Sequence, residues 1–350
     1  MVVGVDGLKI EPLPDNIAGV RTNGQRVPFE AIKDVTSLEE SLDQRVMAGF
    51  GGVAEYGITV RWNKDFLMAL QLTGAAKSES IANTQVRLPV VVVGGGLTAI
   101  DTATESLAYY VVQVEKFLNR YEALSAAINE QTLRNRWSSE EIEIADEFLS
   151  HARAIRSERT LAASESRAPR IVEMIQGWGG VSIAYRRRMI DSPAYTLNHE
   201  EVEKALEEGI TFLEGLSPLS IDIDDHGAAR AIIFKASNQR RGDTTGGAEV
   251  RLAARTIFVA AGTQPNTVLA REDAGHFRLD GKYFQACDEN GVPVKPQYSI
   301  SKPDEPRVLL SRAEDGRFIS FFGDLHPSYF GNVVKALGST KQGHPCLLYT

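Results

Sequence analysis

Three consecutive glycines stand where a buried strand is predicted to end and a helix to begin. Residues 88–93, LPVVVV, are entirely apolar and rich in β-branched side chains, a pattern typical of a central parallel strand. The next six residues have the form GxGxxA, and Ala103 and Leu107 then continue a helical spacing of small and apolar residues. Between a strand and a helix, this pattern predicts a dinucleotide-binding turn.

The chemistry predicted for this turn is the binding of a pyrophosphate. Gly94 permits a tight turn, and Gly96 lets the backbone approach the ligand because it carries no side chain. Thr98 and Ala99 open a helix whose first N–H groups and positive dipole end favour phosphate. We therefore expect the cofactor-binding residues of this segment to be Gly94, Gly95, Gly96, Thr98 and Ala99.

The sequence offers two alternative sets of residues for recognition of the adenosine ribose of the cofactor. Glu115 lies about 20 residues beyond the glycines, the spacing expected of an acid that binds the 2′-hydroxyl of NAD. If residues 111–177 are an insertion, the second strand is instead residues 181–185, and Arg186 and Arg187 follow it. Guanidinium groups fit a 2′-phosphate, so this second arrangement favours NADP over NAD.

A helical insertion is predicted between these two strands, over residues 111–177. Ser138 and Glu141 have the spacing of a capping box at a helix start, and Phe148 and Ala152 follow at helical spacing. Charged residues dominate the rest of the segment. Because charged helix faces are usually solvated, the insertion is expected to carry no chemistry.

Composition excludes several classes of protein. The chain has 350 residues and a net charge of −8, which disfavours binding to nucleic acid or to an anionic membrane. Cys287 and Cys346 are far apart and form no CxxC pair, which argues against a disulfide scaffold, a redox dithiol or a cysteine-ligated iron–sulfur cluster. His199 is expected at a helix start, and no side chains have metal-ligand spacing.

The same composition gives an expectation about location. No stretch approaches the roughly 18 apolar residues that a membrane span requires, and the first residues, MVVGVD, lack the pattern of a signal peptide. We therefore expect a cytoplasmic protein.

Several segments resemble the NADPH domain of the glutamate synthase small subunit and related FAD-dependent pyridine nucleotide oxidoreductases. The similar segments are residues 90–101, 184–187, 200–210 and 258–266. The last of these, FVAAGTQPN, is similar to the family pattern Val-Ile-Val-Ala-hydrophobic-Gly-x-x-Pro-Asn, and the resemblance implies that Gly262 binds cofactor. It covers most of residues 85–270 apart from the insertion.

Shorter matches extend the resemblance to the FAD domain of the family. Residues 51–58, GGVAEYGI, look like its Gly-Gly-x-x-x-Tyr-Gly-Ile segment, and residues 322–336 look like its closing Gly-Asp motif with the helix that follows. By resemblance, Gly323 and Asp324 would bind the ribityl or pyrophosphate region of FAD. Asp6, which ends the apolar run VVGV, would bind the adenosine ribose of FAD.

The chain also departs from the family pattern. A glycine fingerprint should precede Asp6, and a long series of FAD-domain strands should follow Trp62, yet neither is present in the sequence. We therefore expect the sequence to be a fragment, or to lack internal stretches of the FAD domain.

The predicted fold is α/β, with two Rossmann-like dinucleotide-binding domains. An NAD(P) domain, residues 85–270 with the helical insertion at 111–177, would lie within an incomplete FAD domain formed by residues 1–84 and 271–350. The function implied is that of a flavin-dependent oxidoreductase unit that accepts hydride from NADPH. Its electrons would pass through FAD to an iron–sulfur or synthase partner domain or subunit.

Hydride chemistry belongs to the cofactors, so no catalytic acid or base is assigned. Two alternatives remain open. One is a nucleotide-binding interaction module without flavin or catalysis, with the insertion as its docking surface. The other is an NADP dehydrogenase without flavin, which would need a proton-transfer residue near the nicotinamide.

Overall fold

The computed structural model describes residues 26–28, 60–237, 247–262, 265–331 and 333–349. The chain divides into two units, residues 1–262 and residues 263–350, and each is described by itself. Asp6 and residues 51–58, on which part of the FAD resemblance rests, lie outside the described residues.

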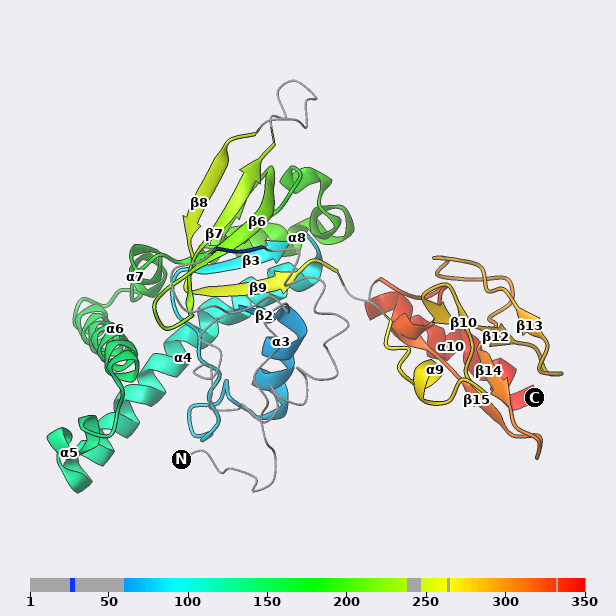
Figure 1. The fold of residues 1–350 in the computed structure, drawn as a ribbon, viewed down its shortest axis with the longest axis horizontal. Helices are drawn as coiled ribbons and strands as arrows, with labels where there is room; N and C mark the ends of the chain where they lie inside the picture. The colour runs from blue at the N-terminus through cyan, green and yellow to red at the C-terminus, as the bar shows by residue number, and fades with distance from the viewer. Residues whose placement is uncertain (1–25, 29–59, 238–246, 263–264, 332, 350) are drawn as a thin grey trace. The chain divides into compact units, whose positions relative to one another are not determined.

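Five parallel strands form the centre of the first unit (Figure 1). Their bounds are β2 Val60–Trp62, β3 Val90–Gly94, β4 Val181–Ala184, β5 Thr211–Leu213 and β9 Thr256–Ala260. The strand order is β2-β9-β3-β4-β5. After β3 the chain proceeds outward through β4 and β5, and it later returns to the other side of β3 as β9. The predicted central strand and the α/β fold class are confirmed.

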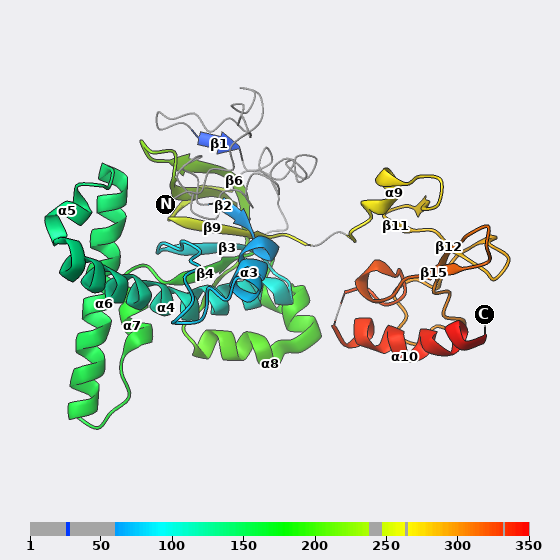
Figure 2. The same ribbon diagram turned by 90° about the horizontal axis from the view of Figure 1, so that it is seen from below.

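The two faces of this sheet are covered differently (Figures 1 and 2). Val90 and Val92 of β3 pack with helices, whereas Val91 and Val93 pack with a second, antiparallel sheet, because successive side chains of a strand point to opposite faces. The helices on the first face include α3 Asn63–Leu72, α4 Leu97–Ile128 and α8 Pro193–Glu207. The second sheet has the order β1-β6-β7-β8 and consists of β1 Arg26–Pro28, β6 Leu216–Ile223, β7 Ala229–Ala236 and β8 Glu249–Ala253.

The predicted helical insertion is present, and it begins as a continuation of α4. This helix has 32 residues and shows no break near residue 111. The return path consists of α5 Glu130–Arg134, α6 Ser139–Ser164 and α7 Ile171–Gly177. The predicted capping box is confirmed: Ser138 Oγ accepts from the Glu141 N–H at 3.2 Å, and the Glu141 carboxylate accepts from the Ser138 N–H at 2.7 Å.

A group of charges around the buried Arg87 joins α6 to the segments that precede β3 and β9. The Arg87 guanidinium, 4% exposed, contacts Glu147 at 2.5 Å and Glu143 at 3.1 Å. Arg255 contacts the same two carboxylates, at 3.4 and 2.8 Å. Both arginines draw the pKa of Glu143 below its usual range. The insertion is therefore tied to the edge of the sheet at which β3 and β9 begin.

The second unit is built around a small antiparallel sheet, of order β13-β12-β14-β15. The elements of this unit are α9 Leu269–Glu272, β10 Leu279–Asp280, β11 Tyr283–Phe284, β12 Ala286–Cys287, β13 Pro293–Val294, β14 Leu309–Arg312, β15 Phe318–Ser320 and α10 Val333–Tyr349. Phe284, Ala286, Leu310 and Phe321 form its core.

The expected boundary between residues 84 and 85 does not coincide with a boundary in the structure. Strand β2 pairs with β9 in the central sheet, and Phe66 of α3 packs in the same core as β3. Residues 60–84 therefore belong to the same unit as the glycine turn. That residues 1–84 and 271–350 form one FAD-binding domain remains a prediction.

Candidate dinucleotide-binding site

Gly94 is the last residue of β3, and the neighbouring strand requires it to be glycine. It pairs with Ala260 of β9, and a Cβ at this position would lie 2.3 Å from the Ala260 carbonyl oxygen. The sequence interpretation assigned Gly94 to a tight turn. The structure instead shows that the close approach of β9 excludes a side chain here.

Gly95 is enclosed by residues that follow β4. A Cβ on Gly95 would lie 2.5 Å from the ring of Tyr185. The Tyr185 backbone is in turn fixed by β5 and β6, because its N–H donates to the Leu213 carbonyl and its carbonyl accepts from the Leu216 N–H, both at 2.9 Å. The Tyr185 ring, held on this backbone, therefore leaves no room for a side chain at Gly95.

Gly96 faces open space. It is the N-cap residue of α4. In the part of the chain that the structure describes, no side chain caps the helix, and no atom lies within 4 Å of the position that the Gly96 Cβ would occupy. Among the described residues, no acceptor is found for the N–H groups of Gly96, Leu97 and Thr98. Since the first N–H groups of a helix have no partner within the helix, these three amides are available to an anionic ligand.

The first turn of α4 contains no acidic residue, so no carboxylate there competes with a phosphate. Asp101 lies slightly farther along. Its pKa is raised, first because surrounding protein atoms shield the carboxyl group from water and then because Glu201 and Glu105 are close.

The second strand of the sheet is β4, as expected if the insertion is looped out. It pairs with β3 in parallel from Val90↔Val181 to Val93↔Ala184. Arg186 and Arg187 follow it and are exposed; in the described part of the chain, neither side chain has an ion pair or hydrogen bond. Arg188 differs, because Asp191 binds its guanidinium at 2.7 and 2.9 Å. Within the described ranges, Arg186 and Arg187 therefore remain without an ion-pair partner at the end of β4.

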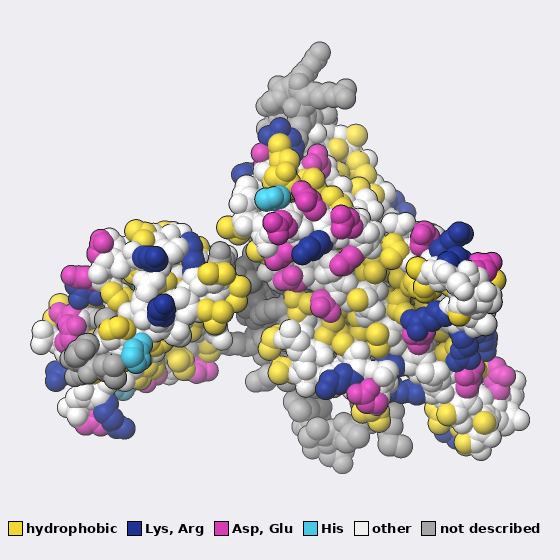
Figure 3. Space-filling view, turned by 180° about the vertical axis from the view of Figure 1, so that it is seen from behind, with side chains coloured by type: hydrophobic (Ala, Val, Ile, Leu, Met, Phe, Trp, Pro, Cys, Tyr) yellow, Lys and Arg dark blue, Asp and Glu magenta, His cyan; other side chains and the backbone are white. Residues whose placement is uncertain are grey.

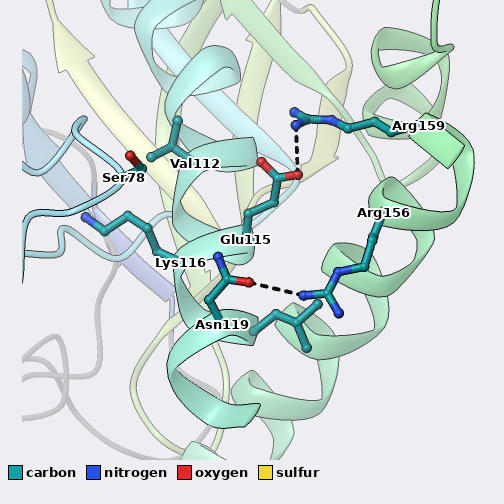
Figure 4. Close-up of a pocket in the computed structure, with 8 residues that line it drawn as sticks. Ser78, Val112, Glu115, Lys116, Asn119, Arg156 and Arg159 are labelled. Atoms are coloured by element: carbon teal, nitrogen blue, oxygen red, sulfur yellow. Dashed lines mark hydrogen bonds and ion pairs between the residues drawn. The ribbon is translucent and has the colours of Figure 1, made fainter. Parts of the chain in front are cut away.

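Glu115 does not lie at the end of a strand, so the NAD interpretation based on it is wrong. It is in the middle of α4, where its carboxylate pairs with Arg159 of α6 at 3.2 Å (Figure 4). Together with Arg156 and Asn119, this pair lines a cavity of about 270 Å³ between α4 and α6. The spacing of about 20 residues fails because the helix that follows the glycines does not end where an ordinary crossover helix would.

Gly262 lies two residues beyond the end of β9. Its φ of +116° is a left-handed conformation that glycine adopts without strain, and open space surrounds its missing side chain. Because all five strands run parallel, the ends of β3, β4 and β9 share one edge of the sheet. Eight of the predicted cofactor-binding residues therefore lie at this edge. They are Gly94, Gly95, Gly96, Thr98, Ala99, Arg186, Arg187 and Gly262.

Gly323 and Asp324 lie in the second unit, in a short 3₁₀ turn of residues 323–325. Gly323 has a φ of +68°, and its N–H donates to the Ser339 hydroxyl of α10 at 2.9 Å. The Asp324 carboxylate accepts from the Gly331 N–H at 3.2 Å. The predicted sequence of a Gly-Asp turn followed by a helix is therefore present, with the turn bonded to the helix.

Sequence reasoning missed two residues that contact the glycine turn, Tyr185 and Ala194. Tyr185 lies against Gly95, and the Ala194 N–H donates to the Gly95 carbonyl at 2.9 Å. The position of Tyr185 at the end of a predicted strand was a usable signal, because the end of the second strand must lie beside the turn. Ala194 gave no signal, since it acts through its backbone.

Charged side chains are distributed unevenly over the surface. On the face shown in Figure 3, acidic side chains predominate over the upper middle of the first unit, and the two signs mix over the helical insertion. Among the described residues, no helix has the length and apolar character needed to cross a bilayer. In the same residues, no three His, Cys, Asp or Glu side chains are arranged to hold a metal ion.

Comparison with known proteins gives one sequence relative. No protein-family model matches the chain. Uncharacterized protein RP006 of Rickettsia prowazekii (strain Madrid E) is 28% identical over 410 residues, and the match covers 98% of this chain and 49% of that protein. The chain therefore spans about half the length of the curated relative it matches. Since the aligned stretch is longer than the chain, it includes positions at which this chain has no residue.

The solved structures similar to this chain include three thioredoxin reductases. That of Lactococcus lactis has 15% identity and a TM-score of 0.40, covering 86% of this chain and 61% of that one. That of T. acidophilum has 13% identity and a TM-score of 0.40, with 86% and 60% covered. The Streptococcus pyogenes protein has 12% identity and a TM-score of 0.27, with 74% and 51% covered. At these values the likeness assigns no function.

Proposed function

We propose that the first unit binds NADP(H) at the edge where β3, β4 and β9 end. The observation that carries this proposal is the set of three unpartnered N–H groups at Gly96, Leu97 and Thr98, beside open space. They lie where the strand order reverses between β3 and β9, and ligands of open parallel sheets bind at such points. Arg186 and Arg187 would then bind the 2′-phosphate.

The residues present fit this cofactor. A Cβ at Gly96 would enter the open space that a pyrophosphate needs. The guanidinium groups of Arg186 and Arg187 have no partners among the described residues and are available to bind an anion. When bound, NADPH supplies the hydride. The chain's own residues bind and orient it: the amides of the glycine turn hold the pyrophosphate, and the arginines distinguish the phosphorylated ribose from the plain one.

We propose further that FAD accepts this hydride, so that the protein is a flavin-dependent oxidoreductase unit. Support comes from the resemblance of residues 258–266 and 322–336 to the glutamate synthase small subunit and related enzymes. The hydrogen bonds that join Gly323 and Asp324 to Ser339 and Gly331 agree with that motif. The electrons would pass to an iron–sulfur or synthase partner, and the expected location is the cytoplasm.

The test is a visible absorption spectrum of the purified protein, recorded before and after anaerobic addition of NADPH. Fluorescence titration with NADPH and with NADH, on the same preparation, measures pyridine nucleotide binding separately. We expect a flavin band that bleaches on adding NADPH, and tighter binding of NADPH than of NADH.

The two measurements separate the parts of the proposal. Tight NADPH binding without a flavin band, even after incubation with FAD, would leave the nucleotide site standing and favour an interaction module without flavin. A chain that binds neither nucleotide would refute the assignment of the glycine turn.

A further inference from the structure

The start of α8 lies against the glycine turn and holds one of its peptide groups. Ala194, the second residue of α8, donates its N–H to the Gly95 carbonyl oxygen at 2.9 Å. Ala194 is 0% exposed, so this bond is shielded from water. The ring of Tyr185 fills the space beside Gly95. Gly95 is thus held through both its carbonyl group and its Cα.

The direction of the Gly95 carbonyl sets the direction of the next N–H. The peptide bond between Gly95 and Gly96 is trans, so its C=O and N–H point in opposite directions. Because the carbonyl is directed at α8, the Gly96 N–H is directed away from α8. That amide has no acceptor among the described residues and is therefore left for a ligand.

The same turn of α8 also anchors the arginine segment. Ser192, the N-cap residue, is fully buried; its hydroxyl accepts from the Tyr195 N–H at 3.2 Å, and its N–H donates to the Met189 carbonyl at 2.9 Å. The Met189 N–H donates to the Glu214 carboxylate at 2.7 Å. Met189 follows directly on residues 186–188. The first turn of α8 thus joins the glycine turn to the arginines.

We propose that Ala194 is a positioning residue for the dinucleotide. It acts through Gly95, whose carbonyl it holds, and thereby orients the Gly96 N–H toward the pyrophosphate. This inference rests on the proposed function, because it presupposes a dinucleotide at the glycine turn.

The decisive test replaces the amide at Ala194 by an ester, which removes the N–H and leaves the side chain unchanged. The matched control is an ester at Thr196, whose N–H donates to the Ser192 carbonyl at 3.1 Å within the same turn and does not contact Gly95. We expect the Kd for NADPH to rise about tenfold with the Ala194 ester and less than twofold with the Thr196 ester. The Kd for NADH should rise by the same factor, because both nucleotides carry the pyrophosphate.

A second measurement does not depend on the stability of either ester. In the wild-type chain labelled with ¹⁵N-glycine, NADPH should shift the amide resonance of Gly96 more than that of Gly95, whose neighbouring contacts are to protein. Wild-type protein that binds no NADPH would refute the proposed function itself. NADPH binding with an unmoved Gly96 resonance, or with equal Kd values for wild type and the Ala194 ester, would overturn the positioning role alone.

Discussion

At the scale of single residues, three adjacent glycines are required for three different reasons. Gly94 leaves room for the Ala260 carbonyl, Gly95 leaves room for the Tyr185 ring, and Gly96 has no protein atom near its missing side chain. The first two requirements come from packing within the folded chain. Only Gly96 leaves space that a ligand can use. Gly94 and Gly95 therefore matter for the stability of the fold, and Gly96 matters for binding.

Substitution of these glycines by alanine should show that separation. Gly94→Ala places a Cβ against backbone and should lower the free energy of unfolding by about 1–3 kcal/mol. Gly96→Ala should leave it unchanged or raise it by less than about 1 kcal/mol, yet weaken NADPH binding at least about tenfold, or about 1.4 kcal/mol. Urea unfolding and fluorescence titration measure the two quantities. Unchanged NADPH affinity in Gly96→Ala would remove Gly96 from the binding site.

The arginines after β4 give a second prediction at this scale. Arg187→Ala and Arg186→Ala should each raise the Kd for NADPH about tenfold or more, since a hydrogen bond between charged groups contributes about 1.5–3 kcal/mol. The Kd for NADH should not change. Arg188→Ala is the control, because Asp191 already binds that guanidinium. An unaltered ratio of NADPH to NADH affinity in the first two variants would contradict the assignment of the 2′-phosphate.

At the scale of elements, the insertion depends on buried charge. Glu147 is one of two carboxylates that Arg87 and Arg255 share, and Glu143 is the other. Glu147→Ala removes the contact of 2.5 Å with the buried Arg87 guanidinium and leaves the pair with Glu143, so it should lower the free energy of unfolding by about 1.5–3 kcal/mol. The comparison is Glu122→Ala, whose exposed pair with Arg156 should contribute less than about 1 kcal/mol. Equal losses measured by urea unfolding would mean that the buried cluster is not what holds α6.

Elements with a strong local pattern could be predicted, and contacts between distant segments could not. The apolar run at residues 90–93, the glycines, the second strand at 181–184 and the capping box at Ser138 were all visible, because each depends on neighbours in sequence. The cluster around Arg87 was not visible, since its partner carboxylates lie 56 and 60 residues away. The place of β2 in the central sheet was missed for the same reason.

At the scale of the whole molecule, each unit contains a histidine whose pKa is lowered by burial. Nδ1 of His151 and the Tyr110 hydroxyl share a hydrogen bond at 2.6 Å, and His326 lies between the Arg307 carbonyl and the Ser328 N–H. In both cases removal from water is the main cause that lowers the pKa of the ring. The unfolded chain, in which histidine titrates near pH 6.5, therefore binds more protons than the folded chain just below that pH.

The free energy of unfolding should consequently fall as the pH drops from about 7.5 through about 6.5, where ordinary histidines take up a proton. His326→Asn keeps a donor and an acceptor but cannot titrate, so its loss of unfolding free energy between pH 7.5 and 5.5 should be smaller than that of the wild type. The same smaller loss of unfolding free energy is expected for His151→Asn. His226→Asn, at an exposed site where no described residue bonds the ring, serves as the control. Parallel stability curves for wild type and His326→Asn, measured by urea unfolding, would show that His326 does not contribute.

The length of α4 has a mechanical consequence. With 32 residues the helix is about 48 Å long, whereas the five-residue strand β3 beside which it starts measures only about 17 Å. Most of the rod therefore projects past the sheet (Figure 1). A tilt of about 5° at its first turn displaces the far end by about 4 Å over this length. The displacement from such a tilt would be largest at the far end of α4, and a pair of probes near Leu124 and on the sheet would report it as a change in distance.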